Sequence, residues 1–443
     1  MAGAALGLGA LPLLRPGIPF AAERAVISPE DAMAMAEARR GELVELLSRL
    51  IRVRSLSGEA GDTAQDLVAD YLSDLPYDVS ISRHRPSDYA EHAEYMPPNP
   101  PGDGPFANVV ARPTANASRY ALFAHIDTHH VEDGWSTDPY EPLLRDGRLY
   151  GLGASDDKGG IAAMLVAAAA LAEKPGLAPV LISSHGKGGG SRGSLPLFQT
   201  LREAGESLDG LLYVHPAETG RGLADIKHAV RGVLDFELAV TGWQGEPLEI
   251  GLPDSALWEE GGDALAHLSA LIEHLRAGPL ADVEVNVGRL QAGERPGAVP
   301  TSARAQIRLL FDGDHTWRGL MQAVRSELEQ QSGADAQGAR AFAVSAEPLG
   351  MRTNPGAVPW DAPSTRALRS AIAAVTGAAP ASYPNHYAGD IRYPLRLMGT
   401  PSFGIGSLGG NFYGPNEWVD VDDLVRLVAV VILTLSGWQA QGQ

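Results

Sequence analysis

Histidine and carboxylate side chains cluster in one segment, HIDTHHVEDGWSTDPYEPLLRDGRLYGLGASDDKGG, from His125 to Gly160. His125 ends an apolar run and can ligate a metal through one ring nitrogen, while Asp127, two residues on, can orient that ring. Asp156 lies in a glycine-flanked turn before a helical run, where a carboxylate can bridge two cations. The chain has no cysteine, so any metal must be held by histidine and carboxylate. The segment therefore predicts a metal site.

Apolar runs that end near these residues alternate with helical runs. The β-type runs lie at 107–113, 120–128, 180–185 and 210–216. One amphipathic helix is predicted over 28–54 with Ser28 as its cap, a buried helix over 159–172, and a final helix over 421–435. Strands alternating with helices predict an α/β sheet with its chemistry at the strand ends.

The pattern changes after about residue 229, where an inserted domain is predicted. Alternating strands at 232–242 and 303–313 flank helical stretches at 264–275 and 317–328, the pattern of a small α+β unit. We expect an apolar arm or signal remnant over 1–27, a catalytic domain in two parts over 28–228 and 347–443, and an inserted lid or dimerisation domain over 229–346. A chain of 443 residues is also too long for one ordinary core.

Composition restricts the partners that this chain can have. With 35 basic and 54 acidic residues, the formal net charge is -19, which argues against nucleic acid and anionic membranes. A small-molecule or peptide-like substrate is therefore expected. The N-terminal apolar stretch is too short and too interrupted by proline for a membrane span, so the cytoplasm and an exported location both stay open.

The residues after His125 resemble the aminoacylase, carboxypeptidase G and succinyl-diaminopimelate desuccinylase family of zinc metallopeptidases. In that family a His-x-Asp strand end precedes W-x-x-x-P-[FY], then L-Y-G-x-G, and then an aspartate before Lys-Gly. The same order is found here in Trp135, Pro139, Tyr140, Leu149, Tyr150, Gly151, Gly153, Asp156, Lys158 and Gly159. The resemblance covers about residues 35 to 440. It implies an α/β fold with a mixed-sheet zinc-peptidase-like catalytic domain and an inserted α+β domain.

The resemblance also implies a set of metal ligands. The family holds two zinc ions bridged by the aspartate, and one ion takes the first histidine, that aspartate and an acidic residue of an E-P-T strand end. In this chain those positions are His125, Asp156 and His215, with Glu218 as the rival to His215. Histidine is an ordinary zinc ligand, so this set can be complete.

The ligands that bind only the second zinc ion in the family are missing from this chain. The glutamate pair of the family falls on Lys187 and Gly188 in KGGGSRGS, and the late histidine falls on Tyr413 in YGPNEW. A single divalent cation, expected to be zinc, follows from this; a site without a cation is the alternative. The first glutamate is the family's general base, and a charged lysine cannot take over that role.

Several other residues are candidates for the missing functions. His129, His130 and His185 lie near the inferred metal edge and could supply a ligand or a base, or be structural histidines. Lys187 could anchor a charged substrate or, if desolvated, act as a base or nucleophile.

Two late segments resemble substrate-binding regions of the family. In AGDIRYP, Asp390 and Arg392 match a Gly-x-x-Asp-x-Arg region and His386 precedes them, so a substrate carboxylate could bind there, with a surface salt bridge as the alternative. Tyr413 is a further candidate for substrate binding. GERPGAVP resembles a substrate loop, although Gly297 replaces its asparagine.

We therefore expect a divergent metallohydrolase that cleaves an amide bond of an N-acyl amino acid or a small peptide. Two other hypotheses stay open at this point. One is a non-catalytic relative that binds ligands in the cleft, and the other is a metal-independent enzyme that uses Lys187. A homodimer through the inserted domain is also expected from the resemblance.

Overall fold

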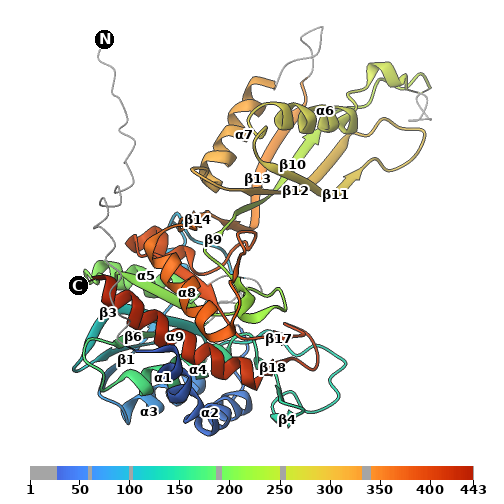
Figure 1. The fold of residues 1–443 in the computed structure, drawn as a ribbon. Helices are drawn as coiled ribbons and strands as arrows, with labels where there is room; N and C mark the ends of the chain where they lie inside the picture. Colours follow the sequence, from blue (N-terminus) through green and yellow to red (C-terminus); the bar gives the residue numbers. More distant parts are fainter. Residues whose placement is uncertain are drawn as a thin grey trace, which may run out of the picture.

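The computed structural model describes residues 27–57, 62–98, 103–185, 192–249, 256–331 and 341–442. Two sheets with separate helices divide this part of the chain into two lobes, joined at a narrow waist (Figure 1). We call them the catalytic domain and the inserted domain. The predicted N-terminal arm over 1–27 lies outside the described residues except for Ile27.

The helices and strands have the following bounds. The helices are α1 Pro29–Glu37, α2 Arg40–Arg52, α3 Asp62–Ser73, α4 Lys158–Leu171, α5 Ser194–Glu203, α6 Ala264–Ala277, α7 Trp317–Gln331, α8 Pro363–Thr376 and α9 Val421–Gly442. The strands of the two main sheets are β1 Tyr77–His84, β2 Phe106–Pro113, β3 Ala117–His125, β6 Ala178–Ser184, β7 Gly210–Val214, β10 Gly232–Thr241, β11 Glu284–Ala292, β12 Ser302–Phe311, β13 Ala343–Thr353 and β16 Ser402–Ile405. Short strands are β4 Leu143–Arg145, β5 Arg148–Tyr150, β8 Asp225–Ile226, β9 Ala229–Val230, β14 Gly356–Ala357, β15 Ala381–Ser382, β17 Gly409–Gly410 and β18 Trp418–Asp420.

The catalytic domain is built on a mixed six-stranded sheet in the order β1-β2-β6-β3-β7-β16. Strands β6, β3, β7 and β16 run parallel to one another, while β2 pairs antiparallel with both of its neighbours, β6 and β1. The mixed α/β fold is thus as predicted. Parallel strands place their carboxyl ends at one edge, where ligands bind in such folds.

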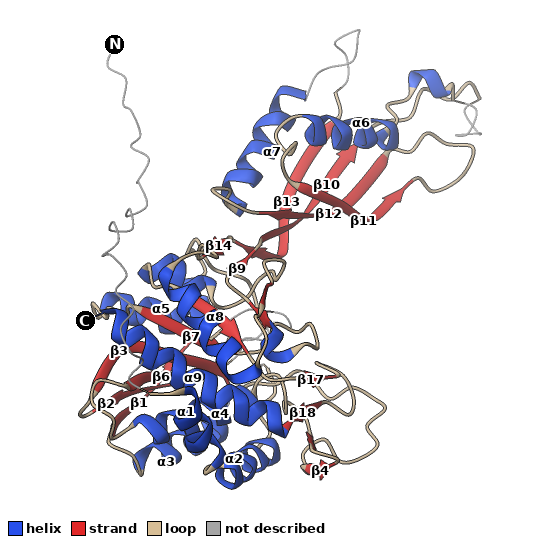
Figure 2. Ribbon diagram, viewed as in Figure 1, coloured by secondary structure: helices blue, strands red, loops and turns tan. Residues whose placement is uncertain are grey.

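Helices cover both faces of this sheet because its central strands are apolar on both sides. On β3, Leu122 and Ala124 join the core formed with α4 and α9, whereas Ala121 and Phe123 join the core formed with α5. Figure 2 shows α4, α9 and α1 layered against the sheet. The sheet edge that carries the candidate residues is therefore supported from both sides.

The prediction of one helix over 28–54 is wrong, because the chain forms two helices there. Ser28 does cap the first one, since its hydroxyl accepts a hydrogen bond from the Asp31 amide at 3.0 Å. The helix then ends at Glu37 and a second one begins at Arg40. The bend lets α1 pack on α9 while α2 packs on α4, and Gly41 in the first turn of α2 weakens a continuous helix.

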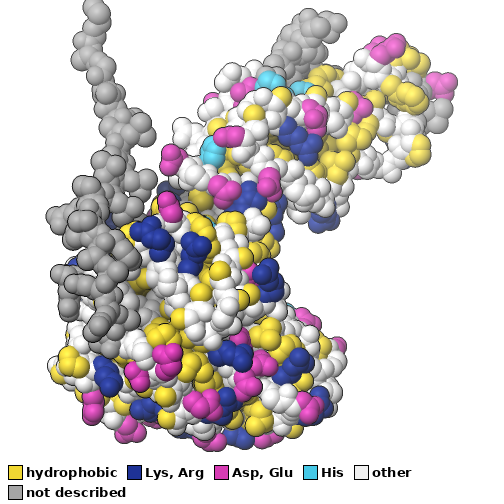
Figure 3. All heavy atoms as spheres, in the orientation of Figure 1, with side chains coloured by type: hydrophobic (Ala, Val, Ile, Leu, Met, Phe, Trp, Pro, Cys, Tyr) yellow, Lys and Arg dark blue, Asp and Glu magenta, His cyan; other side chains and the backbone are white. Residues whose placement is uncertain are grey.

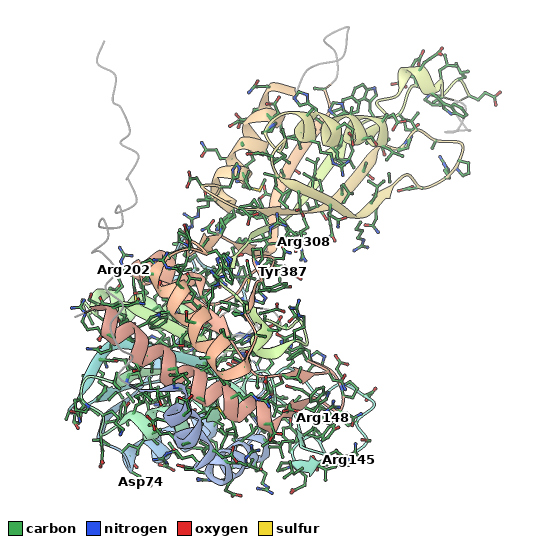
Figure 4. The ribbon with its side chains drawn as sticks, in the orientation of Figure 1. Asp74, Arg145, Arg148, Arg202, Arg308 and Tyr387 are labelled. Atoms are coloured by element: carbon green, nitrogen blue, oxygen red, sulfur yellow. The ribbon has the colours of Figure 1, made fainter. Side chains whose placement is uncertain are left out.

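The inserted domain is a four-stranded antiparallel sheet in the order β11-β12-β10-β13, with α6 and α7 packed on one face (Figure 2). Its last strand, β13, continues to Thr353, beyond the expected limit near residue 346. The chain enters through β9 and leaves through β14, which pair with each other. Figure 4 labels Arg308 of β12 and Tyr387 of the catalytic domain at this waist, where the guanidinium carbon lies 5.8 Å from the ring centroid.

A buried polar network also ties the two domains together. The Glu94 carboxylate accepts hydrogen bonds from the Arg396 guanidinium at 2.5 Å and from the Asn354 amide at 2.9 Å. The Asn354 side-chain oxygen accepts from the backbone amide of Trp317, and the Trp317 indole donates to the Ala93 carbonyl at 2.9 Å. The start of α7 is thereby held against the catalytic domain.

No helix in the described ranges is both long and apolar enough to cross a membrane. The C-terminal helix α9 is apolar because it packs in the core: Leu427, Val428 and Val431 are fully buried there. On the face shown in Figure 3, acidic and basic side chains are interspersed over the catalytic domain.

Candidate metal centre

Three histidines lie at the carboxyl ends of neighbouring parallel strands. His125 is the last residue of β3, while His185 and His215 directly follow β6 and β7. Asp156 reaches the same edge from the turn that precedes α4. Residues separated by up to 90 positions in sequence are thus brought to one edge of the sheet, as the β-type runs predicted.

His125, Asp156 and His215 form a buried cluster. The Oδ1 atom of Asp156 lies 2.9 Å from His125 Nε2 and 3.1 Å from His215 Nε2. One ligand atom from each residue falls within 4.8 Å of the others, and this is the one such group of three or more found among the described residues. Two ring nitrogens therefore face the same carboxylate oxygen.

Asp127 holds the far side of the His125 ring. Its Oδ1 atom lies 3.3 Å and its carbonyl oxygen 3.0 Å from His125 Nδ1, and Ser57 donates a hydrogen bond to its Oδ2 atom. Burial opposes protonation of His125, but the carboxylates of Asp127 and Asp156 outweigh it and raise the pKa of the ring to about 10. For Asp127, burial would raise the pKa, yet contact with His125 holds it well below its ordinary value.

The turn that carries Asp156 is held by the buried carboxyl group of Glu417. Its Oε1 atom accepts hydrogen bonds from the backbone amides of Ser155 and Asp156 at 2.9 and 2.8 Å. Its Oε2 atom accepts from the Gly153 amide at 2.8 Å. Burial raises the pKa of Glu417 to about 8, although the three N–H donors lower it in part. Glu417 thus satisfies three amides that would otherwise be buried without a partner.

Helix α4 fits closely against β7 because Gly160 has no side chain. A Cβ atom at Gly160 would lie 1.9 Å from the Val214 carbonyl oxygen and 2.2 Å from Asp157 Oδ1. Only glycine allows this approach. The close packing keeps Asp156, just before the helix, beside His215, just after the strand.

Partly exposed polar side chains form the mouth of the cluster. Glu218 Oε1 lies 3.6 Å from His215 Nε2 and accepts a hydrogen bond from the Tyr413 hydroxyl at 3.0 Å. His386 Nδ1 lies 3.8 Å from Glu218 Oε2, and His129 packs edge-on against Tyr413 with ring centroids 4.1 Å apart. Glu218 and Tyr413 both have a left-handed backbone, with φ of 61° and 62°, a strain that is concentrated at functional sites.

The donor set of the cluster fits a zinc ion. Two imidazole nitrogens and one carboxylate oxygen are the usual three protein ligands of a catalytic zinc site, which keeps a fourth position open. Asp127 supplies the carboxylate that normally orients a ligand histidine from behind.

Comparison with known proteins agrees with this arrangement. Residues 121–436 match Peptidase family M20/M25/M40. The chain belongs to this family. As an M20 protein with these relatives, it is a metal-dependent hydrolase of the amidohydrolase and peptidase type.

Individual M20 relatives are similar along most of the chain. The succinyl-diaminopimelate desuccinylase of Methylobacterium radiotolerans is 29% identical over 401 residues, which cover 87% of this chain and 94% of that protein. The enzyme of the same name from Rhodospirillum centenum is 28% identical over 357 residues, covering 78% and 88%. Among solved structures, an aminopeptidase from Bacillus cereus has a TM-score of 0.66 at 16% identity and covers 90% of this chain and 98% of its own. That last likeness concerns the fold.

Other predicted site residues of this M20 chain are absent from the ligand group or lie outside the described part. His185 is fully buried and stacks on Phe106 with centroids 5.7 Å apart, and it is absent from the ligand group. His130 pairs with Glu132 on the surface at 2.6 Å. Lys187 and Gly188 lie outside the described residues.

The predicted carboxylate-binding pair is buried rather than presented to a substrate. Asp390 and Arg392 have no exposed surface and lie 3.5 Å apart. The Arg392 guanidinium donates to the Ala388 carbonyl and to the Tyr393 hydroxyl, each at 2.5 Å. The alternative of a surface salt bridge is wrong, and substrate contact by Arg392 would require this loop to move.

The segment that resembles a substrate loop lies on the inserted domain. Residues 293–295 and 298–300 line a hollow of about 280 Å³ together with Gln244, whose amide donates to the Val299 carbonyl. This hollow is separate from the metal cluster, which belongs to the other domain.

One neighbour of the cluster was not predicted from the sequence. The ammonium group of Lys227 lies 2.6 Å from His215 Nδ1, and its side chain is 1% exposed. The segment ADIKHAV, in which Lys227 follows the apolar Ile226, was singled out by no motif in the sequence analysis. Glu417 was missed as well, although the segment PNEW that contains it had been singled out.

Proposed function

We propose that this chain hydrolyses the amide bond of an N-acyl amino acid or small peptide with one zinc ion held by His125, Asp156 and His215. The observation that carries the proposal is the convergence of two ring nitrogens on one Asp156 oxygen, at 2.9 and 3.1 Å. When bound, zinc would polarise the scissile carbonyl and activate water.

The relatives support this class of substrate. The curated proteins that resemble the chain over most of its length are named for the removal of a succinyl group from diaminopimelate. That reaction breaks an amide between an acyl group and an amino-acid nitrogen. A solved M20 relative from Bacillus subtilis is described as a dinuclear metal-binding peptidase, whereas Tyr413 here occupies the mouth with its hydroxyl on Glu218. One metal is therefore our proposal for this chain.

The residues of the mouth would handle the substrate and the proton. Glu218 has a partly exposed carboxylate beside His215, so it can take up a proton at Oε1 or Oε2. His386 Nδ1, 3.8 Å from that carboxylate, is placed to receive the proton next. The Tyr413 hydroxyl can donate a hydrogen bond to a carbonyl oxygen, and burial raises its pKa well above the ordinary value, so that it stays protonated. Asp127 keeps His125 in position.

Metal analysis tests the proposal. Purified protein should contain about one zinc per chain, and removal of the metal with a chelator should abolish hydrolysis of a panel of N-acyl amino acids. Restoring zinc should restore activity. A protein that holds no zinc, or that hydrolyses the same substrates equally well after chelation, would contradict the proposal and favour a metal-independent reaction.

A homodimer through the inserted domain is a further proposal. Strand β11 lies at the edge of its sheet, and Leu290 on it is 52% exposed, with Trp258 on the same domain 66% exposed. Figure 3 shows hydrophobic side chains on this part of the inserted domain. An unpaired edge and exposed apolar side chains favour association. Analytical ultracentrifugation of the native protein should give twice the chain mass of 46.6 kDa. The Leu290→Lys variant should sediment as a monomer. A monomeric native protein would refute the dimer.

A further inference from the structure

The position of Lys227 is fixed by its backbone pairing and by the space that a neighbouring glycine leaves for its side chain. Its backbone pairs in both directions with Gly404 of β16, through hydrogen bonds of 2.9 and 2.8 Å. A Cβ atom on Gly404 would lie 2.5 Å from the Lys227 Cε atom, so the glycine leaves room for the lysine stem. The Lys227 Nζ atom lies 5.4 Å from the centroid of the Tyr213 ring and 2.6 Å from His215 Nδ1.

The contact constrains the proton on the His215 ring. A lysine ammonium has three donors and no acceptor, so its hydrogen bond to Nδ1 requires a lone pair on that nitrogen. The single proton of the neutral ring then lies on Nε2, which faces Asp156 Oδ1 at 3.1 Å. A nitrogen that carries a proton cannot ligate a metal. In this arrangement, His215 Nε2 donates a hydrogen bond to the Asp156 carboxylate, and no cation is needed between them.

A second arrangement of the same atoms suits a metal. The Pro216 carbonyl oxygen lies 2.8 Å from His215 Nδ1 and can accept a proton from it. A backbone carbonyl is a common partner for the outer nitrogen of a ligand histidine, and it leaves the lone pair on Nε2. Nδ1 cannot both accept from Lys227 and donate to Pro216, so the two arrangements exclude each other.

We infer that Lys227 is a positioning residue that lowers the zinc affinity of this site by competing with Pro216 for His215 Nδ1. The inference rests on the proposed function, because it uses His215 as a ligand. The ammonium also places a positive charge behind the ring that must face a dication, which adds repulsion in the same direction. The site should therefore bind zinc more weakly than the same ligand set would without Lys227.

Zinc affinity in Lys227 variants tests the inference. Full-length protein is stripped of metal, and zinc is titrated in competition with a chromophoric chelator. Lys227→Gln offers an acceptor for an Nδ1 proton and Lys227→Met removes the charge, so both should bind zinc more tightly, by about 10-fold to 100-fold, the usual size of such outer contacts. Lys174→Met, at an exposed lysine, serves as the matched control and should bind as the native protein does.

A spectroscopic readout separates positioning from general destabilisation. With ¹⁵N-labelled histidine, metal-free native protein should show the His215 proton on Nε2, and Lys227→Gln should shift it to Nδ1. If Lys227→Met fails to fold, as judged by thermal unfolding, the Gln variant decides the question.

The outcomes distinguish this inference from the proposed function. Zinc binding by native protein with equal or weaker affinity in a folded Lys227 variant would overturn the inference and leave the proposed function intact. If neither the native protein nor the folded variants bind zinc, both are overturned. Tighter binding in the variants with an unchanged His215 proton position would also overturn it, because the effect would then not pass through the ring.

Discussion

Asp156→Ala should lose at least about a thousandfold in kcat/KM, or about 4 kcal/mol of transition-state stabilisation. The reason is that both ligand rings meet at Asp156: its Oδ1 atom is the one that His125 and His215 share. Without it, two imidazoles with centroids 5.3 Å apart would have to hold a dication with no negative ligand between them. Zinc affinity, measured by equilibrium dialysis with elemental analysis, should fall in parallel.

A matched variant shows whether the loss is specific to this carboxylate. Asp225 is also buried, and it bonds to Thr219 at 2.6 Å away from the ligand group. Asp225→Asn should therefore keep its zinc and its kcat/KM. Asp156→Asn preserves the side-chain volume, so it separates the loss of the carboxylate from a packing defect. It should lose zinc as the alanine variant does. Native zinc affinity in either Asp156 variant would remove Asp156 from the ligand set.

Glu417→Ala should lower the free energy of unfolding by about 3–9 kcal/mol, because three buried backbone amides lose their acceptor at roughly 1–3 kcal/mol each. These amides belong to Gly153, Ser155 and Asp156, so the turn that presents the Asp156 ligand should loosen as well. Urea unfolding with equal metal content measures the first effect, and zinc affinity the second. The exposed Glu141, paired with Arg52 at 3.2 Å, is the control, and Glu141→Ala should cost less than about 1 kcal/mol.

The same carboxyl group gives a pH dependence with a defined sign. Its pKa rises from 4.5 to about 8 on folding, so the folded protein binds the proton more tightly than the unfolded chain does. Its contribution to stability is complete below pH 4.5 and is lost as the pH rises towards 8. Between pH 4.5 and 6.5 other groups also change the stability: burial lowers the pKa of His84 and His267, which gives the opposite slope, and raises the pKa of Asp423, which gives the same slope. The comparison of the native protein with Glu417→Gln isolates the contribution of Glu417, because the variant should lose a part of the slope in which stability falls as pH rises; equal slopes in the two proteins would exclude Glu417 as a source.

The ligand cluster could be predicted because the family resemblance implied its members, and local patterns are consistent with their positions. His125 and His215 each end an apolar run, and parallel strands bring such ends to one edge. Asp156 lies in a glycine-flanked turn before a helix, a position that both the pattern and the family resemblance indicated. The mixed α/β fold and the inserted α+β unit followed from the change in hydrophobic periodicity along the chain.

The supporting residues could not be predicted because their partners are remote in sequence. Glu417 reaches amides that are 261 to 264 positions away. The backbone of Lys227 pairs with Gly404, which is 177 positions away, and its side chain contacts His215. The motif around Arg392 suits carboxylate binding, but the side chain is buried beside Asp390 and Tyr393. Burial of this kind depends on tertiary packing, which the spacing of residues in a motif does not reveal. Helix α1 likewise packs on α9, a partner from the other end of the chain.

The pairing of β9 with β14 makes the inserted domain an exchangeable module. Because Val230 and Gly356 are neighbours across this ribbon, the chain leaves and re-enters the catalytic domain at two adjacent points. The chain entropy lost on closing a long insertion between two such points is only slightly larger than that lost on closing a short one. An ancestral chain could therefore gain, lengthen or replace this unit by recombination without disturbing the strand ends that carry the ligands. The inserted domain and the hydrolytic chemistry could then evolve independently within one polypeptide.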